Sequence, residues 1–103
     1  MFARVTLLEI DTVRTDVDTA LERFKEIVLP ELRKQEGYLG VYVLGTAEGK
    51  GLLMSLWANE AAASVESGFY DEQLAKFMSL FRSPPGRDHY RVFLVEVPGM
   101  TPA

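Results

Sequence analysis

The sequence predicts an α+β domain whose strands and helices follow one another in the order βαββαβ. Two observations lead to this prediction: four short segments are rich in branched and aromatic residues, and two longer segments repeat apolar residues at spacings of three and four. The 103 residues include no cysteine, and a chain of this length buries enough surface to fold as one domain without disulfides. We expect that domain over residues 1–98, followed by a short tail over 99–103.

The first strand and the first helix account for the first third of the chain. Residues 2–10 are rich in Val, Leu, Ile and Thr and run into a polar stretch, which is typical of a strand that ends there. A helix should begin after Asp16, a favourable N-cap, and end near residue 35. Its apolar stripe consists of Ala20, Leu21, Phe24, Ile27, Val28 and Leu32. Pro30 removes one backbone hydrogen bond, so we expect a bend there, and Gly37 should form the C-terminal turn.

A β-hairpin is predicted next, with strands over residues 38–46 and 52–58. The intervening segment, AEGKG, has the glycines and polar residues that hairpin turns require. Asn59 is suited to cap a second helix, which Ser67-Gly68 should divide into two pieces.

The C-terminal part of the chain is expected to finish this second helix and then add the last strand. Helical spacing resumes in Leu74, Phe77, Met78 and Phe81. The Ser83-Pro84-Pro85-Gly86 run should form a loop, and residues 90–97 (YRVFLVEV) have the composition of a strand.

With right-handed crossovers, this order gives the split βαβ, or ferredoxin-like, arrangement: a four-stranded antiparallel sheet with both helices on one face. Both faces of the predicted strands are apolar, however, since Leu39, Val41 and Val43 alternate with Tyr42 and Leu44. Two helices can cover only one face, and a soluble monomer does not tolerate an uncovered apolar face of that size. We therefore expect an obligate homodimer that packs sheet against sheet.

Composition and charge exclude several classes of protein. With 11 Lys and Arg against 15 Asp and Glu, the net charge is −4, which disfavours nucleic acid as a partner. There is no apolar run long enough for a membrane span and no basic leader, so we expect neither membrane insertion nor secretion. The absence of cysteine fits a reducing compartment, and a cytoplasmic location is expected.

The residue inventory also excludes familiar catalytic chemistries. His89 is the single histidine, and no Gly-x-Ser-x-Gly elbow presents a serine nucleophile. His89 is interpreted as an exposed residue at the start of a strand. Glu22 and Glu26 are four residues apart and could chelate a metal, but the neighbouring Arg23 and Lys25 favour a solvated helix face.

Three polar residues near the predicted sheet and second helix are candidates for a ligand site. The Trp57 indole N–H needs a partner and could orient a substrate carbonyl, although a purely structural anchor is favoured. Asn59 could donate a hydrogen bond to substrate or serve only as the helix cap. The Tyr70 hydroxyl follows the helix break and could transfer a proton, or the ring could simply pack.

Polar residues within the apolar strands are a second feature of interest. Arg4 and Thr6 in the first strand, Ser55 in the third and Glu96 in the fourth must find partners if they are buried. Arg4 could pair with Glu96, but we favour both side chains reaching water near the strand ends. Four apolar side chains could line an aromatic pocket, although a core role is favoured: Phe69, Phe77, Met78 and Phe81.

The sequence resembles the antibiotic-biosynthesis-monooxygenase-like family over nearly the whole chain. The segments that carry this resemblance are Pro30 followed by Glu36-Gly37-Tyr38-Leu39-Gly40, then Ser55-Leu56-Trp57, and then Glu66-Ser67-Gly68-Phe69-Tyr70. The resemblance implies a dimeric α+β barrel with a small-molecule cavity between helices and sheet in each subunit. It also implies oxidation of aromatic or quinol-like substrates by O₂, with no metal and no flavin or other cofactor.

The family pattern can be carried over to individual residues of this chain. Trp57 matches the family's tryptophan at the end of the third strand, Asn59 follows it, and Tyr70 falls in the aromatic pair of the second helix. The haem-degrading branch uses an Asn in the first strand and a His in the second helix, and this chain has neither. Haem degradation is therefore disfavoured.

The leading hypothesis is a cofactor-independent monooxygenase that acts on a small aromatic or quinol-like substrate, with Trp57, Asn59 and Tyr70 as the catalytic set. These residues would stabilise the anion of an ionisable phenol or quinol, which then reacts with O₂ directly. A non-catalytic ligand-binding or sensing dimer is the alternative, because titratable groups are scarce. An isomerase or a cyclase on the same scaffold is a third possibility.

Overall fold

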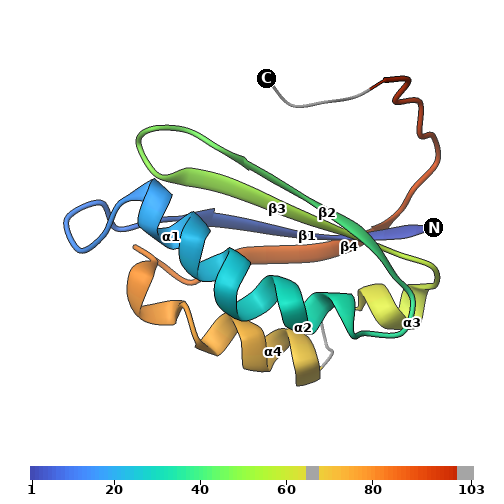
Figure 1. The fold of residues 1–103 in the computed structure, drawn as a ribbon, viewed down its shortest axis with the longest axis horizontal. Coiled ribbons are helices and arrows are strands. Elements are labelled where there is room, and N and C mark those ends of the chain that lie inside the picture. Colours follow the sequence, from blue (N-terminus) through green and yellow to red (C-terminus); the bar gives the residue numbers. More distant parts are fainter. Residues whose placement is uncertain (65–67, 100–103) are drawn as a thin grey trace.

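A four-stranded antiparallel sheet with helices on one face forms the body of the protein (Figure 1). The computed structural model describes residues 1–64 and 68–99. The strands are β1 (Phe2–Glu9), β2 (Tyr38–Gly45), β3 (Lys50–Trp57) and β4 (Gly86–Arg91), paired in the order β2-β3-β1-β4. This is the ferredoxin-like α+β fold that the sequence predicts. Within the described residues, no helix has the length and apolar character needed to cross a membrane.

The first helical region is α1 (Val17–Arg23), a π-helical segment (Phe24–Val28) and α2 (Leu29–Arg33). It begins as predicted, because the Asp16 side chain accepts a hydrogen bond of 2.7 Å from the Thr19 N–H. The irregularity expected at Pro30 lies one turn earlier. There the backbone hydrogen bonds take the wider π-helical spacing, and the Leu29 N–H donates to the Phe24 carbonyl. A π-turn is one way in which a helix absorbs a missing donor. Gly37 follows with a φ of 84°, as expected of a C-terminal glycine.

The second helical region is divided, as predicted, into α3 (Glu60–Ala63) and α4 (Gly68–Ala75). Ser67, the first residue of the predicted Ser67-Gly68 break, lies outside the described residues. The predicted continuation of the helix to residue 81 is wrong. Helix α4 ends at Ala75 and a 3₁₀ turn (Met78–Leu80) follows, after which the Asp11 N–H donates to the Leu80 carbonyl and ties this segment to the end of β1.

The last strand lies earlier in the chain than the sequence predicts. Strand β4 ends at Arg91, which pairs with Phe2, and one further bond joins the Val92 N–H to the Met1 carbonyl. Residues 92–97, predicted to belong to this strand, form no ladder with the described strands. They run away from the sheet on the side opposite the helices (Figure 1), and the Phe93 side chain is 88% exposed.

The core lies between the sheet and the two helical regions. Its buried members are Phe24, Val28, Leu32, Trp57, Ala63 and Phe77. The predicted hairpin is present, and Gly49 supplies its positive φ of 97°. A β-bulge between Tyr38 and Gly40 turns Tyr38 to the helix side of the sheet, where its ring meets Trp57 edge to face at 5.6 Å.

The sheet face turned away from the helices is apolar and uncovered within the chain. Cross-strand register places Leu7, Leu52 and Leu44 side by side on this outer face. The Leu7, Leu44 and Tyr90 side chains are 54%, 52% and 54% exposed, respectively. The observation behind the predicted sheet-to-sheet dimer, two apolar sheet faces with helices on only one, is therefore present.

Candidate functional site

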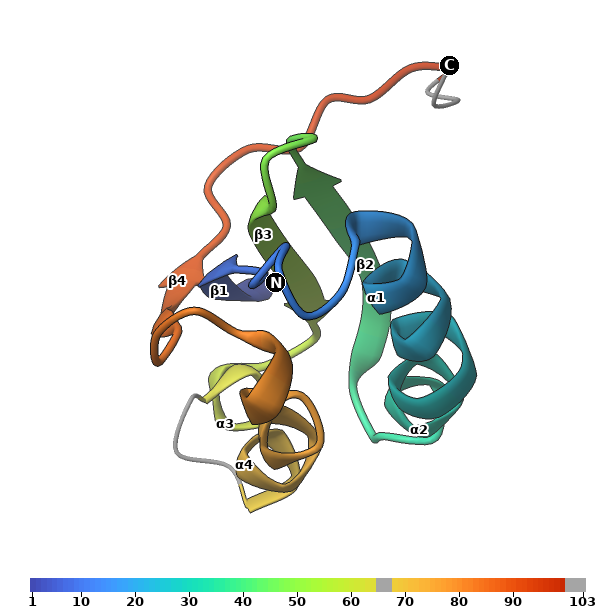
Figure 2. The same ribbon diagram turned by 90° about the vertical axis from the view of Figure 1, so that its left-hand side faces the viewer.

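A cavity of about 720 Å³ lies between the two helical regions and the inner face of the sheet. Figure 2 shows the two helical regions side by side beneath the sheet, with α1 and α2 on the β2 side and α3 and α4 on the β4 side. The cavity volume falls in the range of small-molecule sites. The fold therefore offers each chain one binding site of its own, framed by both helical regions.

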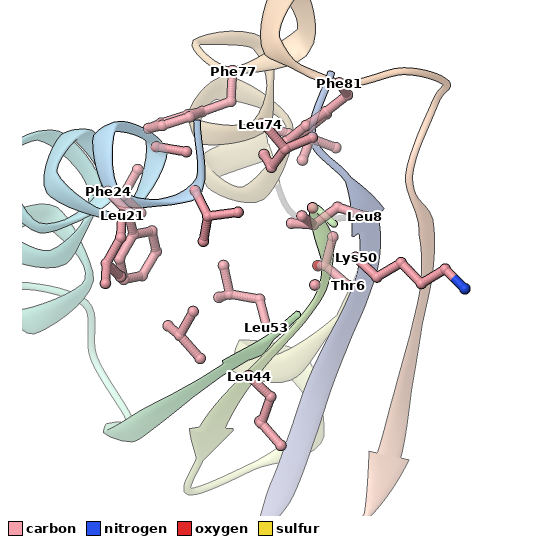
Figure 3. Close-up of a pocket in the computed structure, with 18 of the residues that line it drawn as sticks. Thr6, Leu8, Leu21, Phe24, Leu44, Lys50, Leu53, Leu74, Phe77 and Phe81 are labelled. Atoms are coloured by element: carbon pink, nitrogen blue, oxygen red, sulfur yellow. The ribbon is translucent and has the colours of Figure 1, made fainter. Parts of the chain in front are cut away.

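Apolar side chains form most of the cavity wall (Figure 3). They come from β1, from the first helical region, from β2 and β3, and from the second helical region: Leu8, Ile10, Leu21, Phe24, Val28, Leu32, Val43, Leu53, Phe69, Leu74, Phe77 and Phe81. In Figure 3, Leu21 and Phe24 face Leu74 and Phe77 across the space, while the Lys50 ammonium points away from it. Such a wall favours a flat apolar ligand over a polar one.

The aromatic residues of the second helical region divide between cavity and surface. Phe69, Phe77 and Phe81 line the cavity, and Phe77 also belongs to the buried core. Met78, the fourth apolar residue of the predicted set, is exposed and is not part of the wall. The three phenylalanines therefore serve both roles that the sequence left open: they pack in or against the core, and they line the cavity beside it.

A cluster of buried polar side chains lies within this apolar wall. Thr6 and Tyr70 line the cavity, and the Thr6 Oγ1 lies 2.5 Å from the Tyr70 hydroxyl oxygen in a buried hydrogen bond. Arg4 and Ser55 are paired residues of β1 and β3 and line it as well. Gln73 of α4 is the other buried polar residue among those described. The cavity thus combines an apolar body with one polar region that can orient a ligand.

Arg4 is the charged member of this polar cluster. Its side chain is buried, and the guanidinium carbon lies 4.8 Å from the centre of the Trp57 ring and 4.5 Å from that of Tyr70. The Nη1 donates one hydrogen bond of 3.4 Å to the Ser64 carbonyl. Burial lowers the pKa of Arg4 to about 10, with Tyr70 acting in the opposite direction. The side chain therefore keeps its charge at neutral pH.

Trp57 lies behind the polar cluster and does not line the cavity. It is 2% exposed, and its indole Nε1–H donates a hydrogen bond of 2.8 Å to the Ser55 Oγ. The partner that the indole needs is therefore a protein side chain. Through Ser55 and Arg4, Trp57 supports two residues that do face the cavity.

Asn59 and His89 lie outside the cavity wall. The Asn59 Oδ1 accepts a hydrogen bond of 2.9 Å from the Ala62 N–H, which confirms the predicted cap of α3. His89 is half-buried, so its interpretation as an exposed residue is wrong. Its Nε2 lies 3.5 Å from Glu60, and its Nδ1 is buried without a partner among the described residues. The cause is the position of α3, which covers this part of β4.

The predicted site residues are therefore only partly brought together. Tyr70 lines the cavity, Trp57 lies one layer behind it, and Asn59 is engaged at the start of α3. Arg4 and Thr6 are wall residues that the sequence did not identify as site residues. Arg4 was expected to reach water, and no partner was predicted for Thr6. The signal that could have found them is their alternation within β1, since polar residues at every second position of an apolar strand share one face.

The predicted pairing of Arg4 with Glu96 does not occur. Arg4 is buried in β1, whereas Glu96 is exposed in the segment beyond β4. The pairing fails because β4 ends at Arg91, five residues before Glu96. Glu22 bonds to Lys25 at 3.2 Å on an exposed helix face, as expected. Over residues 1–64 and 68–99, no three His, Cys, Asp or Glu side chains are grouped so as to hold a metal ion.

The sequence is similar to a known protein family. Residues 3–67 match the family model described as antibiotic biosynthesis monooxygenase. No curated protein is significantly similar to the sequence.

Several solved structures share the fold. NE2512, a protein of unknown function from Nitrosomonas europaea, is 20% identical with a TM-score of 0.69, over 96% of this chain and 95% of that one. Rv0793 from Mycobacterium tuberculosis is 14% identical with a TM-score of 0.68, over 91% and 96%. A monooxygenase from the gene ActVA-Orf6 of Streptomyces coelicolor, in complex with the ligand nanaomycin D, is 18% identical with a TM-score of 0.67, over 95% and 92%. At these identities the likeness establishes the fold.

Proposed function

This chain belongs to the antibiotic biosynthesis monooxygenase family, and on that premise we propose that it oxidises a small aromatic or quinol-like molecule with O₂ in the cavity between helices and sheet. The observation that carries the proposal is the cavity itself, an apolar space of about 720 Å³ with a buried polar cluster in its wall. An aromatic ring would contact Phe24 and Phe77, and an oxygen substituent would meet Thr6 and Tyr70.

The proposed reaction needs no electron donor other than the substrate. A phenol loses its proton, and the electron-rich ring carbon para to the phenolate oxygen forms a bond to O₂. The O–O bond of the resulting hydroperoxide then breaks as the ring C–H proton leaves, which gives a quinone and water. One oxygen atom stays in the product and the other leaves in water, so the substrate supplies all four electrons that reduce O₂.

We propose that Tyr70 acts directly in this reaction, whereas Trp57 and Asn59 act through other residues. The Tyr70 hydroxyl lines the cavity and can donate the proton with which the second oxygen leaves. Trp57 holds Ser55 and stacks on Arg4, so it acts as a positioning residue. Asn59 would act by fixing the start of α3, the short helix whose C-cap residue, Ser64, presents the carbonyl that Arg4 contacts.

Oxygen uptake with 1-naphthol as the probe tests the proposal. We expect the protein to consume one O₂ for each 1,4-naphthoquinone formed, with one atom of ¹⁸O from ¹⁸O₂ in the product by mass spectrometry. The Tyr70→Phe variant should still bind 1-naphthol and lose most of the turnover. Full activity in a Trp57→Phe, Asn59→Ala, Tyr70→Phe triple variant would overturn the assigned site.

A non-catalytic binding protein is the second candidate, and the composition of the cavity wall favours it. The ionisable side chains among the wall residues are Arg4, Asp16, Asp18, Lys50 and Tyr70, and no histidine belongs to the wall. The choice of general bases is therefore small. Tight binding of 1-naphthol by calorimetry, together with O₂ consumption no faster than in buffer, would identify a binding protein.

We also propose that two copies of this chain associate through the outer face of the sheet. Leu7, Leu44 and Tyr90 are about half exposed on that face, and residues 92–97 extend on the same side with further apolar side chains. A contiguous apolar surface of this kind is typical of an interface. A second copy offers the same surface and closes the contact about a twofold axis.

The association can be tested with one charged substitution and a matched control. Light scattering coupled to gel filtration should give a dimer mass for the unmodified protein and a monomer mass for Leu7→Lys. Val13→Lys is the control, because Val13 is 89% exposed in the loop before α1 and off the sheet. A monomer mass for the unmodified protein would refute the proposed dimer.

A further inference from the structure

Arg4 is a buried cation whose hydrogen-bonding capacity is largely unused by the protein. The side chain is 3% exposed, yet its one hydrogen bond goes to the Ser64 carbonyl at a long 3.4 Å. A guanidinium carries five N–H donors, and a buried charge is normally paired with an opposite one. In residues 1–64 and 68–99, no carboxylate forms an ion pair with Arg4.

The aromatic neighbours of Arg4 compensate for only part of this burial. Trp57 and Tyr70 hold the guanidinium between two rings, at 4.8 Å and 4.5 Å from their centres. Ring faces attract the positive charge and lower the cost of burying it. They are poor hydrogen-bond acceptors, however, so most of the N–H donors still lack a strong acceptor.

The unused donors are open to the cavity. Arg4 lines it, and the one side-chain polar atom that is sealed without a partner in the described part of the chain is Nδ1 of His89. The guanidinium nitrogens are therefore either bonded to Ser64 or accessible. The Tyr70 ring that packs against the guanidinium carries the hydroxyl that shares a hydrogen bond with Thr6.

The acids of the cavity wall lie far from Arg4. Asp16 and Asp18 stand at the start of α1, after β1 has ended, and Arg4 stands near the beginning of that strand. The six residue-to-residue steps from Arg4 to Ile10 span about 20 Å in an extended strand. Within residues 1–64 and 68–99, no acidic side chain of the cavity wall therefore compensates the charge of Arg4.

Arg87 is the contrasting case, a second arginine that packs against the Tyr70 ring. Its guanidinium carbon lies 5.4 Å from the centre of the Tyr70 ring, but its Nη1 is bonded to the Asp71 carboxylate at 2.7 Å. Arg87 does not line the cavity. Two arginines thus pack against one tyrosine ring, and within the described residues only Arg87, which does not line the cavity, is paired with a carboxylate.

We infer that the cavity selects an apolar aromatic ligand that carries a full negative charge, a carboxylate or a phenolate, and that Arg4 binds this charge. An oxyanion accepts hydrogen bonds from a guanidinium in the plane of its N–H groups. The rings of Trp57 and Tyr70 fix that plane, and the apolar wall receives the body of the ligand. The inference rests on the proposed function only in using the same cavity, because it concerns binding and not oxidation.

The test compares two probes that have the same ring system and differ in charge. Isothermal titration calorimetry at pH 7 with 2-naphthoate and with the neutral 2-naphthamide should show at least tenfold tighter binding of the anion. In Arg4→Met, naphthoate should lose that advantage while naphthamide binds as before. Arg87→Met is the matched control and should keep the full preference, because Arg87 is paired with Asp71 outside the wall.

Each result of these titrations either supports or overturns the role of Arg4 in binding the anion. Equal affinity of the two probes for the unmodified protein overturns the inference, and this comparison needs no variant to fold. A preference that survives in folded Arg4→Met also overturns it, since Arg4 would then serve only to hold Ser64. Arg4→Lys, which keeps the charge without the planar fork, should retain part of the preference.

The same titration separates this inference from the proposed oxidation. Selective binding of naphthoate without O₂ consumption from 1-naphthol supports the role of Arg4 and removes the oxygenase. If neither naphthalene probe binds, the cavity does not take aromatic ligands, and the inference and the proposed function both fail. Oxidation of 1-naphthol without any preference for the anionic probe leaves the oxygenase and removes the role of Arg4.

Discussion

The hydrogen bond between Thr6 and Tyr70 offers a sharp test of how the cavity is held together. It joins residues 64 positions apart, from β1 and α4, through two buried hydroxyls whose oxygen atoms are 2.5 Å apart. We consider Thr6→Val, Tyr70→Phe and the two changes combined. Each removes a hydroxyl and keeps the shape of the side chain nearly unchanged.

The magnitude follows from the burial of both hydroxyls. Either single change leaves a buried polar group with one partner fewer, at a cost of about 1–3 kcal/mol in the free energy of unfolding. The double variant loses both hydroxyls together and leaves no such orphan in this pair, so its cost should be about that of one single change. The expected coupling energy is therefore about 1–3 kcal/mol, the cost of one single change.

Urea unfolding of the four proteins, followed by circular dichroism, measures this coupling. In a chain of this length, 1 kcal/mol corresponds to a shift in melting temperature of about 4–8 °C, so thermal unfolding gives an independent reading. Purely additive effects of the two single changes would refute the reasoning. They would mean that the two hydroxyls do not depend on each other in the folded protein.

Three further predictions concern stability. Asn59→Ala should lower the free energy of unfolding by about 1 kcal/mol because it removes the acceptor for the Ala62 N–H, whereas Asn59→Asp keeps that acceptor; equal losses in urea titrations would count against a capping role. Gly49→Ala should cost more than about 1 kcal/mol in the same assay, because φ is 97° and the new Cβ would lie 2.8 Å from the Ile10 carbonyl oxygen; an unchanged midpoint would contradict this. The backbone hydrogen bond from the Thr19 N–H lowers the pKa of Asp16 below its ordinary value of 3.8, so the unfolded state binds the proton more readily. The contribution of Asp16 is then complete above pH 3.8 and is lost as the pH falls through the lower folded value; Asp16→Asn should flatten the pH dependence of stability there, and an unaltered pH profile would exclude this contribution.

Much of the fold could be predicted from the sequence because its signals are local. Asp16 and Asn59 cap the helices that they precede, since a cap depends on a few neighbouring backbone groups. Gly37 and Gly49 take the positive φ angles that the turns require. The alternation and spacing of apolar residues were sufficient to predict the βαββαβ order, and the cross-strand pairing then follows from the rules of chain connection.

The predictions that were wrong depended on partners elsewhere in the chain. Residues 92–97 have the composition of a strand, but a strand needs a neighbour, and pairing with β1 stops at Arg91 apart from one bond from the Val92 N–H to the Met1 carbonyl. The expected continuation of the second helical piece to residue 81 fails for a similar reason. The end of β1 holds the Leu80 carbonyl through the Asp11 N–H, and this bond favours a 3₁₀ turn over another helical turn.

The candidate site divides in the same way between sequence and tertiary structure. The sequence alone determined the residue types available, including the polar positions of β1, the single tryptophan and the aromatic second helical region. Only the tertiary structure decided that Arg4 is buried between Trp57 and Tyr70, that the indole N–H is bonded to Ser55, and that a cavity separates the two helical regions. Burial and the pairing of charges depend on which segments meet in space, and local sequence patterns do not encode those distances.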